Sequence, residues 1–345
     1  MTNFSHPLLQ LTRARLLEFI REPEAIFWVF VFPVLMALGL GIAFRNRPAE
    51  SLAIAVQDGH GAVALAASLD SFPDIRAKVL DSDEARNELR TGKVALVLIP
   101  GDSVTYVFDP TRSESQLARR AVDDAVQRSG GRTDPVQVGE QHLTEPGSRY
   151  IDFLIPGLLG LNLMGSGMWG IGFNIVQARR KKLLKRLLAT PMRKSQYLLS
   201  YALSRFVFML VEVAALVGFG WLVFDVRVHG SLVDLLVVSV VGALAFTGMG
   251  MLTASRAKTL EGVSGIMNLV MMPMWIFSGV FFSYARFPEA FQPFIKLLPL
   301  TPLLDALRST MTDGAPLSAN LGQLAAIAVW GLLSFGIALK IFRWN

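Results

Sequence analysis

Six long apolar runs constrain the fold of this chain more than any other feature of its sequence. A helix needs about 20 apolar residues to cross the hydrocarbon core of a bilayer, and all six runs reach that length. The runs are Ala25–Phe44, Phe153–Val176, Tyr197–Phe224, Leu232–Ala254, Val263–Phe282 and Leu321–Phe342. The first run is longer than the apolar core of a signal peptide, so we interpret it as an uncleaved span. The sequence therefore predicts a membrane α-helical protein with six transmembrane helices.

The charged residues are concentrated between the first two runs. Residues 45–149 hold 13 basic and 16 acidic residues out of 60 charged residues in the whole 345-residue chain. Short β-rich runs bounded by Gly, Asp and Pro predict strands, and capping patterns predict helices. The predicted strands are Leu52–Val56, Val94–Ile99 and Val104–Phe108; the predicted helices are Ala62–Leu69, Glu84–Arg90 capped by Asp81, and one opened by Ser113 with Gln116 that runs to about Arg128. We predict a small α/β domain, joined to the second span by a tether at residues 129–149.

Basic residues in short loops indicate the orientation, because cytoplasmic loops are enriched in Lys and Arg. The loop at 177–196, after the second run, carries eight basic residues, whereas the loop after the third run carries only Arg227. We therefore expect a protein of the cell inner (plasma) membrane with both termini and loop 177–196 in the cytoplasm. The 45–149 domain is expected on the outer side of that membrane. Residues 1–24 alternate leucines with charged residues, which predicts a cytoplasmic amphipathic elbow helix in the membrane interface.

The other five spans are predicted within residues 150–345, and two of their features constrain packing. The second span is rich in glycine, which favours close helix contacts or a dimer seam. Between the fifth and sixth spans, four prolines exclude one continuous helix over residues 283–308. They are Pro288, Pro293, Pro299 and Pro302. We expect short re-entrant or interfacial helices on the outer side here.

The segment RRKKLLKRLLATP is the most informative part of the loop at 177–196. Its leucines recur at helical spacing among basic residues, as in a short amphipathic helix that lies along the membrane surface. Such a helix sets topology and contacts lipid headgroups, or it docks a cytoplasmic partner; periodicity does not separate these alternatives. The residues are Arg179, Arg180, Lys181, Lys182, Leu183, Leu184, Lys185, Arg186, Leu187, Leu188, Thr190 and Pro191.

A few polar side chains fall inside the predicted spans. Glu212 lies in an apolar stretch, and an intramembrane carboxylate is by default a functional candidate because its burial costs several kcal/mol. Arg205 lies two helical turns earlier, which we interpret as too far for a tight pair, so Glu212 is either a packed or protonated structural residue or part of a translocation path. Asn162, Asn174 and Asn268 are further candidates for this path, although interhelical hydrogen bonding is their more common use.

Several chemical functions are excluded by absent motifs. The chain has no cysteine and only four scattered histidines, so a metal site is not expected. It has no GxxxxGK[ST] phosphate-binding loop, no HExxH and no GxSxG. The basic residues flank apolar runs, as membrane topology requires, which argues against nucleic-acid binding. Energy for active transport must therefore come from another chain or from an ion gradient.

Four segments together resemble one known family. REPEAIFWVFVFPVLMALGLGIAF at Arg21–Phe44, with Pro33 at its centre, resembles a first span of that family, and KRLLATPMRKSQYLLSYALSRF at Lys185–Phe206 resembles the basic loop that leads into the third. SGVFFSYARFPEAFQPFIKLLPLTPLLDALRS at Ser278–Ser309 resembles its closing signature. RTGKVALVLIP at Arg90–Pro100, followed by a strand ending at Asp109, is typical of a subgroup with a large extracytoplasmic domain after the first span. The family is that of the membrane subunits of ATP-binding-cassette (ABC) type-two transporters, mostly exporter permeases.

The resemblance implies a homodimer or pseudo-dimer of permeases in membrane lipid, with separate ABC ATPase subunits. By position, it assigns contact with the ATPase to Arg179–Pro191. It also implies that ATP and Mg bind to the partner ATPase, and that this chain has no cofactor and no enzymatic activity of its own. The leading hypothesis is export of an amphipathic, lipid-like or drug-like compound. One alternative is a gradient-driven secondary transporter with Glu212 as proton carrier, although a lone carboxylate and no detectable inverted repeat count against it. Another is a non-transporting membrane sensor or scaffold.

Overall fold

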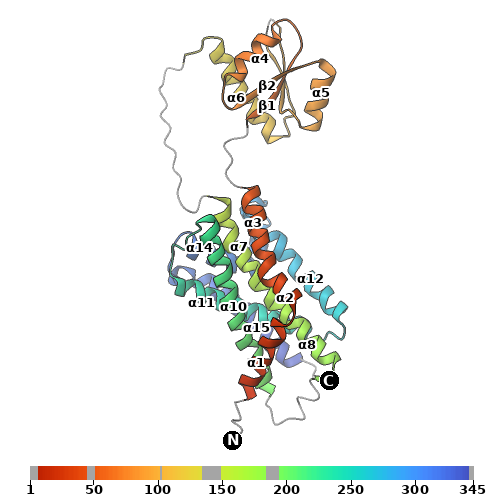
Figure 1. Cartoon of the computed structure of the whole chain (residues 1–345), viewed down its shortest axis with the longest axis vertical. Coiled ribbons are helices and arrows are strands. Elements are labelled where there is room, and N and C mark those ends of the chain that lie inside the picture. Colours follow the sequence, from red (N-terminus) through yellow and green to blue (C-terminus); the bar gives the residue numbers. More distant parts are fainter. Residues whose placement is uncertain (1–6, 45–50, 102, 134–148, 184–193, 342–345) are drawn as a thin grey trace. The chain divides into compact units, whose positions relative to one another are not determined.

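The computed structural model describes residues 7–44, 51–101, 103–133, 149–183 and 194–341 (Figure 1). The chain forms two compact units, one of residues 1–45 with 144–345 and one of residues 46–143. The first, the membrane unit, contains six helical stretches long and apolar enough to span a bilayer. They are Pro23–Ala43, Tyr150–Arg180, Leu199–Phe224, Leu232–Ala254, Leu260–Phe277 and Leu317–Ile341. The predicted fold class, six transmembrane helices with a small α/β domain between the first two, is confirmed.

The first span is interrupted near its proline. Helix α1 (Pro7–Ile20) precedes α2 (Pro23–Ile26), the π-helical turn η1 (Phe27–Val31) and α3 (Phe32–Ala43). In the π-turn the amide of Phe32 donates to the carbonyl of Phe27, five residues earlier. Pro33 has no N–H, so the Val29 carbonyl cannot receive its usual bond from the residue four positions later. A proline is therefore accommodated by widening one turn and freeing one carbonyl.

The second span is built from α7 (Tyr150–Gly165), the π-helical turn η2 (Ser166–Gly170) and α8 (Ile171–Arg180). Its glycines divide into two groups. A Cβ on Gly167 would lie 2.9 Å from Cβ of Phe246, and one on Gly157 would collide with the Val280 carbonyl. A Cβ on Gly165 or Gly170 would meet nothing within 4 Å. Close packing, one of the two predicted uses, thus holds at Gly157 and Gly167, whereas Gly165 and Gly170 leave open space.

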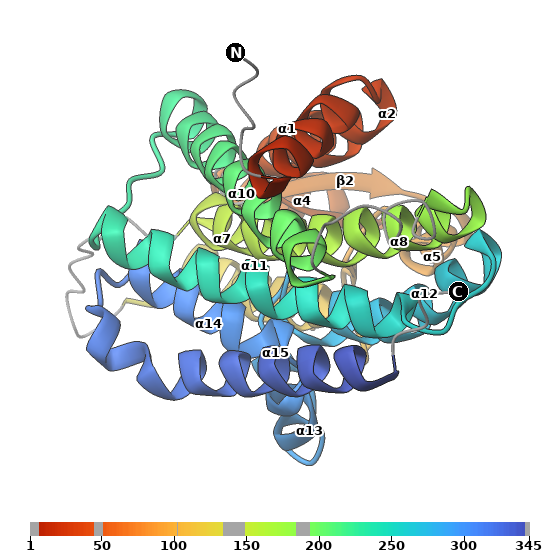
Figure 2. The ribbon, with the colours of Figure 1, turned by 90° about the horizontal axis from the view of Figure 1, so that it is seen from below.

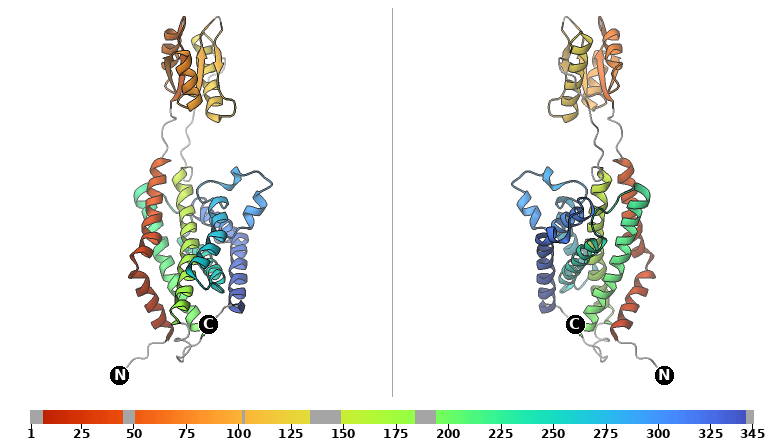
Figure 3. Two further views of the ribbon diagram at one scale, coloured as in Figure 1. Left: turned by 90° about the vertical axis from the view of Figure 1, so that its right-hand side faces the viewer. Right: turned by 90° about the vertical axis from the view of Figure 1, so that its left-hand side faces the viewer.

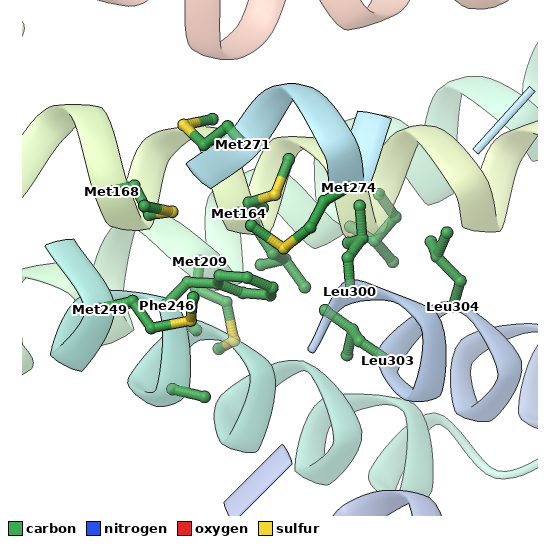
Figure 4. Packing of buried hydrophobic residues seen from close by; sticks show 14 of the residues in the cluster. Met164, Met168, Met209, Phe246, Met249, Met271, Met274, Leu300, Leu303 and Leu304 are labelled. Atoms are coloured by element: carbon green, nitrogen blue, oxygen red, sulfur yellow. The ribbon is translucent and has the colours of Figure 1, made fainter. Parts of the chain in front are cut away.

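The remaining spans are α10 (Lys194–Phe224), α11 (Leu232–Ala254), α12 (Leu260–Phe277) and α15 (Leu321–Ile341). Helices α11 and α15 run side by side (Figure 2), and a Cβ on Gly248 would lie 2.9 Å from the Gly331 carbonyl. Helices α3, α7 and α10 run alongside one another (Figure 3). Unusually many of the side chains in the core between the spans are thioethers (Figure 4). They include Met164, Met168, Met209, Met249, Met271 and Met274, around Phe246.

The proline-rich segment after α12 forms the short helices η3 (Tyr284–Arg286), α13 (Gln292–Leu297) and α14 (Leu300–Met311), before η4 (Leu317–Asn320). Arg308 anchors α14. Its guanidinium donates to the Gly279 carbonyl and lies 3.6 Å from the centroid of the Phe153 ring. Burial lowers the pKa of Arg308 to about 10. A cation so placed holds α14 against the end of the second span.

The α/β domain has a four-stranded sheet in the order β2-β1-β3-β4. Its strands are β1 (Leu52–Gln57), β2 (Ile75–Leu80), β3 (Leu96–Ile99) and β4 (Thr105–Val107). Strand β1 pairs in parallel with β2 and β3, and β4 is antiparallel to β3. Helices α4 (Ala62–Asp70) and α6 (Ser113–Ser129) share one apolar core with the sheet. Helix α5 (Ser82–Thr91) contributes Ala85 to a second, smaller core.

The structure of this domain differs from the sequence interpretation in one strand and in one helix cap. Strand β2 was not predicted, because its sequence IRAKVL carries two charges that suit an edge strand better than a buried one. The helix predicted from Ser113 to about Arg128 is confirmed as α6, but its N-cap residue is Arg112, without a side-chain cap bond, and the Gln116 amide donates to the Pro110 carbonyl at 2.6 Å. The cap at Asp81 is confirmed, since its carboxylate accepts from the amides of Asp83 and Glu84. Most of the predicted tether, residues 134–148, lies outside the described residues.

Candidate functional site

The membrane unit contains a cavity of about 1170 Å³. Its walls come from α1, from the first, second and third spans, and from α12. They are mostly apolar, with aromatic rings from several elements. Among these rings are Phe19, Trp28, Trp169, Phe173, Phe208 and Trp275. This volume slightly exceeds the range of about 300–1,000 Å³ that is typical of small-molecule pockets.

A buried ion pair forms part of the cavity wall. In α10 the guanidinium of Arg205 meets both carboxylate oxygens of Glu212, with Nη1 to Oε1 at 2.6 Å and Nη2 to Oε2 at 2.9 Å. The side chains are 4% and 1% exposed. The prediction that these residues are too far apart to pair was therefore wrong. Seven residues rise by about 10 Å along a helix, and two long side chains that extend toward each other cover this distance.

Polar contacts connect the ion pair to both π-helical turns. The Ser166 hydroxyl, at the start of η2, lies 3.2 Å from Oε2 of Glu212 and also bonds to the Asn162 carbonyl. The Asn162 amide in turn donates to the Val29 carbonyl in η1 at 2.9 Å. Pro33 removes the donor that this carbonyl would have four positions later in an α-helix, and the Asn162 side chain of the second span supplies a donor to it.

The structure brings three of the four predicted path residues together. Asn162, Asn174 and Glu212 all line the cavity. Asn268 is exposed on α12 and is not among the lining residues. Asn162 also makes the interhelical bond that was its alternative interpretation.

Sequence reasoning missed Gln177 and Arg15 as lining residues. Gln177 follows Asn174 by three residues, so the two share one helix face, a spacing visible in the sequence. Arg15 is brought in by tertiary packing. Its Nε donates to the Ser200 hydroxyl at 2.9 Å, and its guanidinium carbon lies 3.1 Å from the centroid of the Tyr201 ring. No local pattern indicated that α1 would contact the start of α10.

The predicted coupling segment is described only in part. Residues 184–191 lie outside the described residues, while Arg180, Lys181, Lys182 and Leu183 are exposed. Arg179 belongs to the fold, because Nη1 and Nη2 donate to the carbonyls of Ala254 and Ser255 at 3.1 Å. These carbonyls end α11, where a cation is favourable.

Comparison with known proteins agrees with this architecture. The profile of a family described as ABC-2 family transporter protein matches residues 23–340, nearly the whole chain. The chain belongs to the ABC-2 transporter family. It is accordingly a multi-pass membrane protein and a permease subunit of an ABC transporter, a class that works with a separate ATPase subunit.

Curated relatives of the permease come from distant organisms. The chain is 27% identical to ABC transporter G family member 20 of Dictyostelium discoideum, over 67% of this chain and 32% of that protein. It is 24% identical to the inner membrane transport permease YadH of Escherichia coli K12, over 59% of this chain and 81% of YadH. A third relative, the linearmycin resistance permease protein LnrN of Bacillus subtilis, is 23% identical over 51% of this chain and 46% of its own length.

Proposed function

We propose that this permease is the membrane-spanning part of an ATP-driven exporter that moves an amphipathic, lipid-like or drug-like compound out of the cytoplasm or the inner leaflet. The observation that carries the proposal is the aromatic-lined cavity of about 1170 Å³ between the first, second, third and fifth spans. An apolar wall with a few polar groups suits a ligand that is mostly hydrocarbon. The name of LnrN, a resistance permease, supports outward movement by analogy.

The partners in the proposal are two ABC ATPase subunits, which bind ATP and Mg, and a second permease copy. The segment 179–191 is the proposed docking segment, with both chain termini on the same cytoplasmic side. Its exposed start at Arg180–Leu183 is compatible with this role. Because Arg179 holds the end of α11, a force applied to the segment reaches the fourth span directly.

Co-purification tests the docking role. The permease is expressed with a candidate ABC ATPase, chosen as a protein with a GxxxxGK[ST] loop encoded next to the permease, and the complex is isolated through a tag on the permease. Leu184→Asp with Leu187→Asp should remove the ATPase and leave membrane insertion intact. The control is Val63→Asp with Leu117→Asp on exposed positions of the α/β domain, which should retain the ATPase. Retention by the Leu184 and Leu187 variant would exclude docking and leave a topological role for the segment.

Transport by the reconstituted complex tests the energy source. Vesicles that contain the permease and its ATPase should accumulate a fluorescent amphiphile only when ATP and Mg are supplied. Glu212 has both oxygens engaged by Arg205, which does not suit a proton carrier that must be exposed to both sides in turn. Uptake driven by an imposed pH gradient without the ATPase, and lost in Glu212→Gln, would replace the proposal by secondary transport.

A further inference from the structure

The two almost fully buried charges in the cavity wall neutralise each other. Arg205 and Glu212 form a two-point pair, both almost fully buried. The guanidinium of Arg15 is engaged by Ser200 and by the Tyr201 ring. The other charged lining residues, namely Glu18, Arg21, Glu22 and Glu24, lie around the break between α1 and α2 and are exposed. Exposed charges remain hydrated and contribute little to recognition.

Two amides remain open in the same wall. The side chains of Asn174 and Gln177 line the cavity from α8, and neither makes a hydrogen bond to another described residue. Each amide carries a carbonyl acceptor and two N–H donors. One turn before Asn174, Gly170 also lines the cavity, and a Cβ there would meet nothing within 4 Å. The backbone thus leaves space beside the amides.

An aromatic surface adjoins the amides on the same helical stretch. The rings of Trp169 and Phe173 are nearly parallel, with centroids 4.9 Å apart and an interplanar angle of 19°, and both line the cavity. Flat rings beside amides that both donate and accept form a surface on which an uncharged polar group can stack and hydrogen-bond.

We propose that the permease recognises amphiphiles whose head group is uncharged and rich in hydroxyl or amide groups, and that Asn174 and Gln177 are the specificity-determining residues for this head. The inference rests on the proposed function, because it assumes that the cavity holds the transported compound. A head with a net charge would leave water for a wall whose buried ion pair is already closed and whose Arg15 guanidinium already contacts Ser200 and the Tyr201 ring, which is costly. An uncharged head exchanges its bonds to water for bonds to the two amides.

Binding of three probes with the same alkyl chain tests the head-group class. The full-length permease in nanodiscs is titrated with dodecyl maltoside, dodecyltrimethylammonium and dodecyl sulfate, each below its critical micelle concentration. Tryptophan emission reports occupancy, since Trp28, Trp169 and Trp275 line the cavity, and empty nanodiscs correct for partitioning into lipid. We expect the maltoside to bind at least about tenfold more tightly than either charged probe, because two hydrogen bonds together are worth about a factor of ten or more.

Two test variants and two control variants locate the effect. Asn174→Leu with Gln177→Leu should weaken maltoside binding about tenfold and leave the charged probes unchanged. Leucine is close in size and apolar, so these spans should still insert. The control is Asn268→Leu, an exposed amide on α12 that does not line the cavity and should bind like the native chain. Gly170→Leu should fill the space and weaken all three probes, whereas Gly336→Leu, also in open space, should not.

The outcomes separate the two proposals. Equal or tighter binding of a charged probe, or unchanged maltoside binding in the Asn174 and Gln177 variant, would overturn the head-group inference while leaving the cavity as the binding site. If Gly170→Leu leaves the affinity for all three probes unchanged, the cavity is not the binding site. That result would remove the observation on which the proposed function stands.

Discussion

At the scale of single residues, Asn162 compensates for Pro33. The proline removes the donor that the Val29 carbonyl would have in an uninterrupted helix, and the Asn162 amide supplies another at 2.9 Å. In the hydrocarbon region no water replaces a lost partner. The residue pair is therefore expected to act as a unit, although the two residues lie on different spans.

A double-mutant cycle measures this coupling. Asn162→Leu should destabilise the permease by about 1 kcal/mol, because the Val29 carbonyl loses its donor. In the Pro33→Ala background the alanine N–H can bond to that carbonyl, so Asn162→Leu should cost less than half as much. Thermal unfolding of the four proteins in the same detergent gives the coupling energy. Additive effects would show that the two residues are energetically independent.

The ion pair gives a second prediction. Glu212→Gln removes one charge and leaves Arg205 uncompensated at 4% exposure, which should cost about 3 kcal/mol. Replacing both partners, with Arg205→Met and Glu212→Leu, should recover much of that loss, because no buried charge remains. Melting temperatures of the two variants provide the measurement. If Glu212→Gln alone has the same melting temperature as the native protein, the ion pair contributes nothing to stability.

Tyr106 in β4 gives a pH-dependent prediction for the α/β domain. Burial, with a hydrogen bond to Asp123, raises the pKa of Tyr106 from 10.0 to about 12. The folded domain thus keeps a proton that the unfolded chain releases near pH 10. This contribution to stability is complete below pH 10 and is lost as the pH rises to about 12. In Tyr106→Phe the free energy of unfolding should fall less steeply across that interval, as denaturant titrations of the domain at several pH values can show.

At the scale of elements, apolar length predicted the spans well because one physical requirement, crossing the hydrocarbon, dominates each of them. Leu232–Ala254 was predicted with its observed bounds. Strand β2 was missed because an edge strand needs only a few apolar contacts and leaves a weak pattern. The two π-turns were also not predicted. A π-turn follows from how a proline or a side chain on a neighbouring helix rearranges the backbone bonds, and this information is not local in sequence.

The candidate site was predictable only in its chemistry. Intramembrane polarity singled out Glu212, Asn162 and Asn174, which all line the cavity. The pairing of Glu212 with Arg205 depended on side-chain conformations that spacing alone does not determine. The contribution of Arg15 depended on the packing of α1 against α10. Polar residue types in apolar runs thus indicated a site, while its electrostatics required the tertiary structure.

The α/β domain has its own apolar core. Ile54 and Leu96 of the sheet pack with Val122 of α6. Residues 51–133 expressed alone should therefore fold as a soluble protein with a mixed α/β circular-dichroism spectrum. Asp81→Ala should destabilise this fragment by about 1 kcal/mol through loss of the α5 cap, as denaturant unfolding can measure. A fragment that stays unfolded would show that the domain depends on the membrane unit.

At the scale of the whole molecule, the proposed orientation decides what each part can contact. Docking to an ATPase requires the segment 179–191 in the cytoplasm, and with six spans the α/β domain must then lie on the opposite side of the membrane from both termini. The native chain has no cysteine, so single cysteines report accessibility without background. Ser115 is buried and would be a poor probe, whereas Glu114 and Lys181 are exposed.

Glu114→Cys should react with a membrane-impermeant maleimide in intact cells whose outer barrier, where present, admits the reagent. Lys181→Cys should react only after the inner membrane is permeabilised, because the eight basic residues of loop 177–196 predict a cytoplasmic location for it. Leu117→Cys, at 61% exposed, repeats the first measurement on the same helix and excludes a local effect of one site. The opposite labelling pattern would show that the chain has the inverted orientation in the membrane. It would then remove both the coupling role of segment 179–191 and the outward direction of transport.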